Sequence, residues 1–265
     1  MRGRARRGPS CPRRGRARRA GLAAGLWLAG LAPAGAVSAA CANDWDSIGE
    51  VCLAHDPSGP VYGHDVLGDV PEWHVLSILY ADPLRPPVEL RQPGHVFEDV
   101  VPRLVDVTGD GFPEVIVVQS SFERGARLVV FAADGGAPRL LAATPYIGTR
   151  NRWLAPAAIA DLDGDGAVEL AYVDRPHLAK VLRIWRFEEG RLREVTHRQG
   201  RTNHRIGDPF ISGGLRTCGA APEIVLADAG WTRLVAARLR DGRIRTRGLG
   251  PLTGPDSFAR ALECR

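Results

Sequence analysis

The sequence predicts an all-β fold, and three observations carry that prediction. Short apolar runs alternate with turn signals, no segment shows a sustained helical period, and a unit of roughly 54 residues recurs along the chain. Such units bury their apolar faces when four-stranded blades pack side by side. We therefore predict a β-propeller of about four blades, or five if the N- and C-terminal strands complete a shared one. An irregular β-sandwich is the alternative.

Residues 1–39 are predicted to be a secretory signal peptide. The first 19 residues hold nine arginines and no acidic residue, and a weakly apolar run interrupted by Pro33 follows them. That run is too short and too rich in glycine and alanine for a good transmembrane anchor. We expect cleavage near Ala39 or Ala40, a periplasmic or secreted protein, and one monomeric domain over residues 40–265. Acylation of Cys41 is the weaker alternative.

Removing the signal peptide reverses the charge of the chain. The full sequence has 35 basic and 30 acidic residues, a net charge of +5, and loss of the nine leader arginines leaves a net charge of −4. A strongly basic chain suggests nucleic acid or an anionic membrane surface as partner, whereas a mildly acidic exported domain suggests neither. We expect no nucleic-acid partner.

Four cysteines remain in the mature chain if Cys41 is kept. They are Cys41, Cys52, Cys218 and Cys264. An even number in an oxidising compartment predicts disulfides. We predict Cys41–Cys52 and Cys218–Cys264, because each pair joins segments that are near in sequence. The alternative, Cys52 with Cys264, would tie the two ends of the ring together.

The repeat is clearest in two segments that share Asp-x-x-Gly-Asp-Gly-x-x-Glu followed by a strand-like apolar run. They are "VDVTGDGFPEVIVVQSS" from Val105 and "ADLDGDGAVELAYVDRP" from Ala160. Degenerate copies begin at His64, "HDVLGDVPEWHVLSILY", and at Cys218, "CGAAPEIVLADAG". The last three copies are each followed by a second apolar run, a turn signal and a further strand candidate.

The two acidic loops predict calcium sites. Calcium takes six to eight oxygen ligands, which alternate residues of a tight loop can supply. The candidate ligands of the second loop are Asp161, Asp163, Asp165, the Ala167 carbonyl and Glu169; those of the first are Asp106, Thr108, Asp110, the Phe112 carbonyl and Glu114. Because Thr108 replaces an acid, we expect the first loop to bind more weakly. The alternative is a pair of hairpin turns with solvated acids and no metal.

Both loops begin like an EF-hand but lack its glutamate at position twelve, where Val117 and Tyr172 stand. They resemble the FG-GAP or VCBS repeats, calcium-binding propeller blades known from integrin α-chain heads and many exported bacterial proteins. The resemblance covers roughly Asp65 to Arg240. It implies calcium ligands at Asp161, Asp163, Asp165 and Glu169, and at Asp106, Asp110 and Glu114.

Basic and aromatic residues precede the loops at equivalent places in successive repeats. One group is Arg150, Arg152 and Trp153, and the other is Asn203, His204 and Arg205. Equivalent loops of a propeller converge on one face, so these side chains predict a cationic patch for a glycan, peptide or protein ligand. The alternative is that they cap turns and pair with nearby acids.

Catalytic signatures are missing from the sequence: there is no Gly-x-Ser-x-Gly, His-Glu-x-x-His, phosphate loop or Cys-x-x-Cys. We therefore expect a calcium-binding interaction module and no enzyme. One alternative is a hydrolase or lyase that uses Arg152, His177 and His204, because propeller enzymes draw residues from several loops. The other is a structural or adhesive surface protein.

Overall fold

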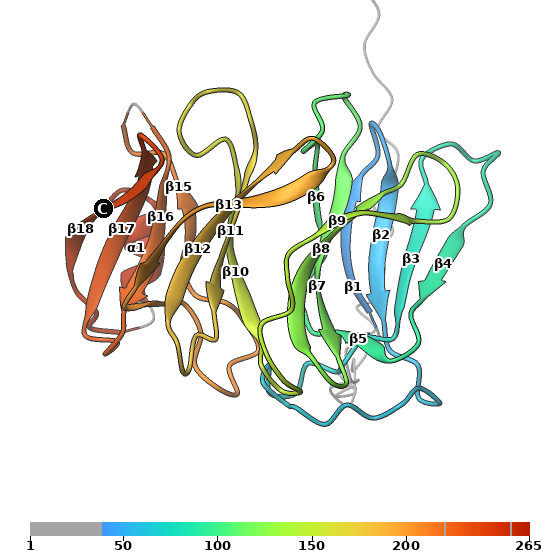
Figure 1. The fold of residues 1–265 in the computed structure, drawn as a ribbon, viewed down its shortest axis with the longest axis horizontal. Helices are drawn as coiled ribbons and strands as arrows, with labels where there is room; N and C mark the ends of the chain where they lie inside the picture. The colour runs from blue at the N-terminus through green and yellow to red at the C-terminus, as the bar shows by residue number, and fades with distance from the viewer. Residues whose placement is uncertain (1–38, 220, 255) are drawn as a thin grey trace, which may run out of the picture. The chain divides into compact units, whose positions relative to one another are not determined.

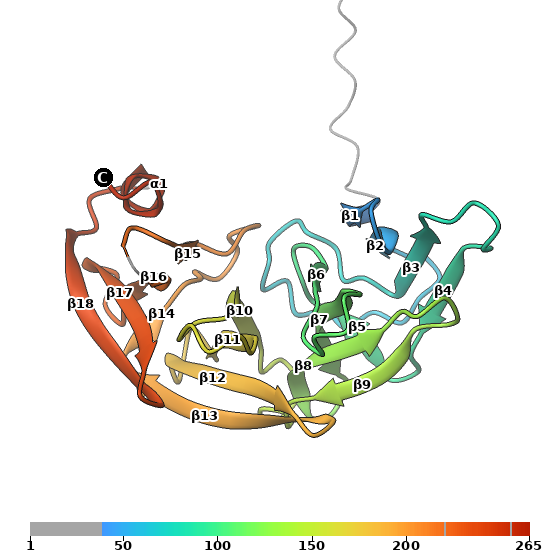
Figure 2. The ribbon, with the colours of Figure 1, turned by 90° about the horizontal axis from the view of Figure 1, so that it is seen from above.

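The computed structural model describes residues 39–219, 221–254 and 256–265, and all of them belong to one compact unit. This part of the chain forms four antiparallel sheets. Figures 1 and 2 show the sheets following one another in chain order along an arc. The predicted all-β propeller of four blades is confirmed. The predicted signal peptide, residues 1–39, lies outside the described residues except for Ala39.

The first sheet has the order β1-β2-β3-β4. Its strands are β1 (Ala39–Asp44), β2 (Gly49–Ala54), β3 (Val75–Tyr80) and β4 (Val88–Arg91). The long connection from β2 to β3 contains the degenerate repeat that starts at His64. This connection contributes residues to the candidate site described below.

The second and third sheets contain the two clear repeats. The second consists of β5 (His95–Phe97), β6 (Arg103–Val105), β7 (Glu114–Ser121), β8 (Gly125–Ala132) and β9 (Arg139–Ala143), with β5 and β6 both pairing with β7. The third is a simple meander of β10 (Leu154–Ala160), β11 (Glu169–Asp174), β12 (Val181–Glu188) and β13 (Arg191–Gln199). In each sheet the acidic loop precedes the strand that begins with the repeat glutamate.

The fourth sheet consists of β14 (Arg201–Thr202), β15 (Gly214–Arg216), β16 (Glu223–Asp228), β17 (Arg233–Arg240) and β18 (Arg243–Pro251). The last strands of the second to fourth sheets, β9, β13 and β18, lie along the outer side of the arc in Figure 2. One short helix, α1 (Asp256–Leu262), follows β18. The sequence did not predict it, because seven residues are too few for a recognisable helical period.

The core lies between neighbouring sheets. Strand β7 is buried along its whole length. Its Val115 and Val117 pack in the core shared with the first sheet, whereas Ile116 and Val118 pack in the core shared with the third. Successive side chains of a strand point to opposite faces, so this strand has a sheet on each side. A two-layer β-sandwich would leave one face exposed, and that alternative is wrong.

Two connections far apart in sequence meet between the first and fourth sheets. The backbone N–H of Gly207 donates to the carbonyl of Val66 at 3.0 Å. Gly68, beside this contact, has a φ of 62°, and a Cβ added to it would lie 2.4 Å from the Gly207 carbonyl oxygen. Only glycine combines that conformation with so close an approach.

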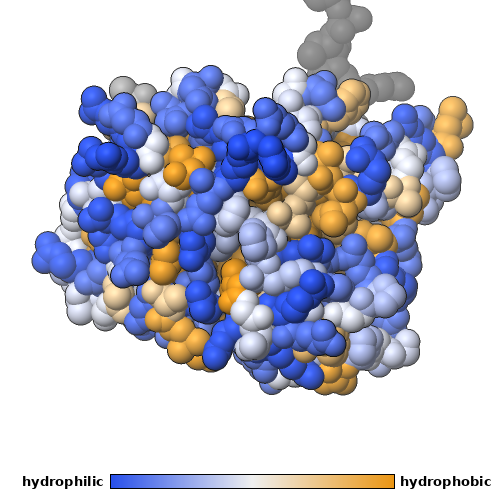
Figure 3. Space-filling model, in the orientation of Figure 1, coloured by the Kyte–Doolittle hydropathy of each residue, from blue (hydrophilic) through white to orange (hydrophobic). Residues whose placement is uncertain are grey.

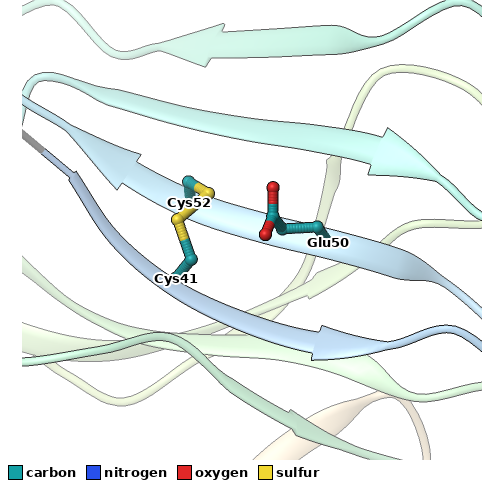
Figure 4. A group of neighbouring side chains, drawn as sticks. All are labelled: Cys41, Glu50 and Cys52. Carbon is teal, nitrogen blue, oxygen red and sulfur yellow. A yellow bond between two sulfur atoms is a disulfide. The ribbon is translucent and has the colours of Figure 1, made fainter. Parts of the chain in front are cut away.

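Both disulfides have the predicted pairing. Cys41 and Cys52 are directly opposite on β1 and β2, and Cys218 joins Cys264 across a sequence separation of 46. Figure 4 shows the Cys41–Cys52 bond with Glu50 nearby. The Glu50 carboxylate lies within 4.8 Å of the sulfur atoms. Metal binding requires thiolates, so this group is a crosslink and no metal centre.

The surface is mainly hydrophilic on the face in Figure 3, with hydrophobic residues exposed in separate patches. The large hydrophobic side chains with the greatest exposure include Leu84, Val61, Ile206 and Phe112. The described part of the chain contains no helix with the length and apolarity needed to cross a membrane.

Candidate functional site

The first aspartate of each acidic loop shapes the loop around itself. Asp106 accepts hydrogen bonds from the backbone N–H groups of Gly109 at 2.7 Å and Gly111 at 2.8 Å. Asp161 accepts the equivalent bonds from Gly164 and Gly166. All four glycines have positive φ, a conformation that glycine adopts without steric cost. The two sequences therefore fold into the same turn.

The repeat glutamate holds each turn by accepting a backbone hydrogen bond from it. Glu114 accepts the N–H of Val107 at 2.9 Å, and Glu169 accepts the N–H of Leu162 at 2.8 Å, in both cases through Oε2. Both carboxylates are buried, and this burial raises the pKa of each. The second oxygen of each glutamate remains for other partners, and there the two loops differ.

In the second loop that partner is an arginine. The guanidinium of Arg186, on β12, pairs with Asp163 at 3.0 Å, with Asp165 at 2.8 Å and with Glu169. Arg186 stands directly opposite Glu169 in the β11–β12 register. Three of the predicted metal ligands thus share one cation supplied by the protein. The guanidinium therefore lies among the carboxylates for which a calcium ion is predicted, while oxygen atoms of Asp161, Asp163 and Glu169 lie within 4.8 Å of one another.

In the first loop the corresponding position holds no cation. Val115 pairs with Phe131, so Ala132 takes the place opposite Glu114. Across residues 39–219, 221–254 and 256–265, no basic side chain forms an ion pair with Asp106, Asp110 or Glu114. The Oε1 atom of Glu114 lies 3.4 Å from the Thr108 hydroxyl.

The surroundings of the first loop fit a hard cation. A hollow of about 220 Å³ adjoins it, lined on the loop side by Thr108, Asp110, Phe112 and Glu114 and elsewhere by residues that include Arg85 and Arg139. Burial raises the pKa of Glu114, and the negative charges of Asp110 and Asp106 raise it further. A cation among these oxygen atoms would relieve that repulsion. From the sequence, this loop was the weaker candidate because Thr108 stands where the second loop has an aspartate. The contact of Arg186 with the second loop could not be recognised in the sequence.

The predicted cationic patch is gathered only in part. A second hollow, of about 280 Å³, receives residues from the β2–β3 connection and from the loops after β9, β11 and β14. We call it the histidine hollow, and its lining is His64, Asn151, Arg152, Trp153, Arg175, His177, Leu178 and Ile206. Trp153 is 2% exposed, and its ring stacks with that of His177 at 6.3 Å and 10°. Loops from successive sheets therefore converge as predicted.

A chain of hydrogen bonds fixes the histidines. The Nε2 atom of buried His204 lies 2.9 Å from the carbonyl oxygen of Asp208, which can only accept. We therefore assign the His204 proton to Nε2, so that Nδ1 accepts from Nε2–H of His177 at 2.9 Å. Burial, with the neighbouring His204 and His64, lowers the pKa of His177 to about 4. Both rings are neutral at physiological pH.

His64 forms a second pair, with Glu98. Its Nδ1 lies 2.8 Å from Glu98 Oε1, and the Glu98 side chain is only 3% exposed. The other oxygen, Oε2, has no hydrogen-bond partner in the described part of the chain. Because Nδ1 faces Glu98, the Nε2 atom of His64 is left for another partner. Sequence reasoning missed this pair, because Glu98 lies 34 positions from His64 in an unremarkable connection.

The rim of the histidine hollow carries two arginines. Arg175 pairs with Asp174 at 2.7 Å, whereas Arg152 forms no ion pair with any described carboxylate. Asn151 and Arg175 both have positive φ, at 61° and 45°. Such conformations are uncommon outside glycine and concentrate at functional sites. The exposed Arg152 is therefore the cation available to a ligand.

Three predicted patch residues lie elsewhere. Arg150 donates to the Tyr62 carbonyl at 2.5 Å. Asn203 is buried and donates to the Pro156 carbonyl at 3.0 Å. The Arg205 guanidinium lies 4.4 Å from the centre of the Trp231 ring, beside a separate hollow of about 570 Å³ that Phe210 and Phe258 also line. Arg150 and Asn203 therefore have structural contacts, as the alternative interpretation proposed.

Comparison with known proteins matches part of the chain to a known repeat family. Residues 106–172, which include both acidic loops, match the FG-GAP-like repeat family, so the predicted resemblance is confirmed there. No curated protein matches the chain. Among solved structures, an exotype rhamnogalacturonan lyase, YesX, is similar at 15% identity and a TM-score of 0.45, over 80% of this chain and 47% of that structure. The chain thus spans about half the length of that structure.

Proposed function

Residues 106–172 carry an FG-GAP-like repeat, and from this we propose that the chain is an exported β-propeller that binds an anionic glycan or peptide. The observation that carries the proposal is the histidine hollow, which is lined both by buried Trp153 and by Arg152, an arginine with no ion pair in the described part of the chain. Arginine recognises carboxylates through two parallel hydrogen bonds. Two disulfides support an oxidising compartment.

The histidines of this hollow suit it to a ligand with hydroxyl groups. His177 is held neutral by its low pKa; its Nε2–H is used by His204, and its Nδ1 can accept. His64 likewise presents Nε2. The ring nitrogens of His64 and His177, the Arg152 guanidinium and the Trp153 ring match the hydroxyl groups, carboxylate and apolar ring face of an acidic sugar.

Calcium binding at the first acidic loop is the second part of the proposal. Asp106, Asp110 and Glu114 would hold the ion, with the Thr108 hydroxyl and the Phe112 carbonyl as neutral ligands. When bound, calcium would neutralise these carboxylates, which have no cationic partner in the described part of the chain. It would also crosslink the turn to the start of β7. A ligand at 100 times its dissociation constant stabilises a protein by about 2.7 kcal/mol. Its role here is therefore rigidity.

The ligand proposal is tested by titrating the purified protein with uronic-acid oligosaccharides, their neutral counterparts and acidic peptides. We expect saturable binding to one acidic class and none to the neutral sugars. Arg152→Ala should weaken that binding by roughly 10- to 100-fold, since a charge-assisted hydrogen bond contributes about 1.5–3 kcal/mol.

Arg243→Ala is the matched control, because it removes the same charge from an exposed position on β18. It should leave binding unchanged. Equal losses in the two variants would reduce the effect to net charge and refute the histidine hollow as the site. Absence of binding to every acidic probe would refute the proposal.

A second candidate function is catalysis, and the His64–Glu98 pair is the observation that favours it. A buried carboxylate that holds Nδ1–H orients an imidazole so that Nε2 can act as a general base. Turnover of an acidic polysaccharide that is abolished by His64→Gln, with binding retained, would establish this function. Binding without turnover, for wild type and variant alike, would leave the interaction module.

A further inference from the structure

We propose that Arg186 is the resident cation of the second acidic loop, so that this loop binds no metal and the first loop is left as the divalent-cation site. The part about the first loop rests on the proposed function. The part about Arg186 stands on its own geometry, and the experiments below separate the two.

The first argument is occupancy. The Arg186 side chain is 17% exposed and reaches Asp163, Asp165 and the fully buried Glu169. Oxygen atoms of Asp161, Asp163 and Glu169 all lie within 4.8 Å of one another, the clustering that a metal would use. A calcium ion there would need six to eight oxygen ligands at about 2.3–2.6 Å. The carboxylates cannot close on an ion while the guanidinium occupies the space beside them.

The second argument is charge. An arginine is always protonated and its planar fork matches carboxylate oxygens. A divalent ion entering beside it would face a like charge, which the same carboxylates would have to screen. Displacing Arg186 instead would strip a partly buried guanidinium of its three ion pairs. Both routes oppose metal binding. In the first loop no described guanidinium pairs with the carboxylates, although Arg85 and Arg139 line the hollow beside it.

The third argument comes from the partners of the four repeat glutamates, which differ from one repeat to the next. Glu72 accepts two backbone N–H groups, from Tyr62 and His64, at 3.0 and 2.9 Å. Glu223 pairs with Arg216 at 2.8 Å and Arg247 at 2.7 Å.

Glu169 has Arg186, as described above. Glu114 and Glu72 have no charged partner among the described residues. Glu72 uses both of its oxygens for backbone N–H groups, whereas Oε1 of Glu114 lies 3.4 Å from the Thr108 hydroxyl. Two of the four repeat glutamates, Glu169 and Glu223, are thus paired with arginines, and of the two complete acidic loops only the first has no carboxylate in an ion pair in the described part of the chain. This is the pattern expected if only the first loop uses a metal.

The decisive experiment exchanges Arg186, opposite Glu169, and Ala132, opposite Glu114, for each other's residue type. After treatment with chelator, the full chain is titrated with calcium by calorimetry. Wild type should bind one calcium ion per chain. Arg186→Ala, which copies Ala132 of the first loop, should bind two, and adding Asp161→Asn to that variant should return the ratio to one. Ala132→Arg should lose the ion that wild type binds.

A second measurement avoids any dependence on how the arginine variants fold. In the wild-type background, Asp163→Asn should leave the calcium titration unchanged, whereas Asp110→Asn should weaken binding by tenfold or more. Circular dichroism checks that both proteins keep their strands.

Three results would overturn the assignment of Arg186: two ions bound by wild type, no additional ion bound by folded Arg186→Ala, or weaker calcium binding in Asp163→Asn. If wild type binds no calcium but Arg186→Ala binds one, the assignment is supported and the calcium part of the proposed function fails. The two proposals can therefore fail separately.

Discussion

His204 accepts a hydrogen bond from His177 and passes none back, because its own N–H is used by the carbonyl of Asp208. Hydrogen bonds are thus donated in one direction only, from His177 to His204 and from His204 to a backbone carbonyl. Protonation of His177 at Nδ1 is compatible with this chain, but it would place a charge in a partly buried ring stacked on Trp153. The pair is therefore built for the neutral state.

Stability should depend on pH through His177. Its folded-state pKa, about 4, lies below the value of about 6.5 expected in the unfolded chain. The unfolded state therefore binds more protons between these values, and the stabilisation is present above pH 6.5 and lost as pH falls toward 4. Urea unfolding from pH 7 to pH 4 should show a smaller decline for His177→Gln than for wild type. Parallel curves would contradict the assignment.

Thr108→Asp should strengthen calcium binding at the first loop. Thr108 holds the position that Asp163 holds in the second loop, and ligand charge is one of the factors that tune calcium affinity. We expect roughly a tenfold lower dissociation constant by calorimetry, with one ion still bound per chain. Thr149→Asp, in the loop before Trp153, is the control for net charge. An unchanged dissociation constant in Thr108→Asp would exclude this position from the ligand set.

The Cys218–Cys264 disulfide should contribute more stability than Cys41–Cys52. Sequence separations of 46 and 11 correspond to about 4 and about 3 kcal/mol in the chain-entropy model. Replacing both cysteines of a pair by serine avoids a free thiol. For a domain of this size, loss of the larger crosslink should lower the melting temperature by on the order of 10 °C. The reverse order would show that packing around α1, and not chain entropy, dominates.

Gly68→Ala should destabilise the fold more than Gly94→Ala. Both glycines have positive φ, at 62° and 72°, so both variants carry the strain of about 1 kcal/mol for a left-handed alanine. Only at Gly68 does the added Cβ meet a backbone carbonyl; nothing lies within 4 Å at Gly94. Chemical unfolding of the two variants isolates that contact. Equal losses would mean that the Gly207 loop moves aside freely.

The fold could be predicted because its determinants are local and repeated. The apolar run after Glu114 and the run after Glu169 each became a buried central strand, and the glycines of each acidic turn took the conformations that the pattern required. The disulfides followed from sequence proximity. Helix α1 was missed, since it is short and packs on β15 to β17 through contacts that no periodicity encodes.

The candidate site was less predictable because its chemistry depends on register and on long-range contacts. Arg186 lies 17 residues from Glu169 and faces it only through the β11–β12 pairing. His64 and Glu98 come from different sheets' connections. Aligning the repeats correctly placed Arg152 and Trp153 in the candidate site. It also suggested Arg150 and Asn203, which hold the backbone in place, because the sequence alone does not separate such structural residues from ligand-binding ones.

The contact between Gly207 and Val66 has a consequence for how the protein folds. Each sheet is formed by neighbouring hairpins and can close rapidly from local segments, as in repeat proteins whose units interact only with adjacent ones. The Gly207–Val66 hydrogen bond instead couples the first sheet to the last, and it can form only after the intervening sheets are in place. It is therefore expected to form late, on the native side of the folding barrier, so that its loss accelerates unfolding and leaves the folding rate unchanged.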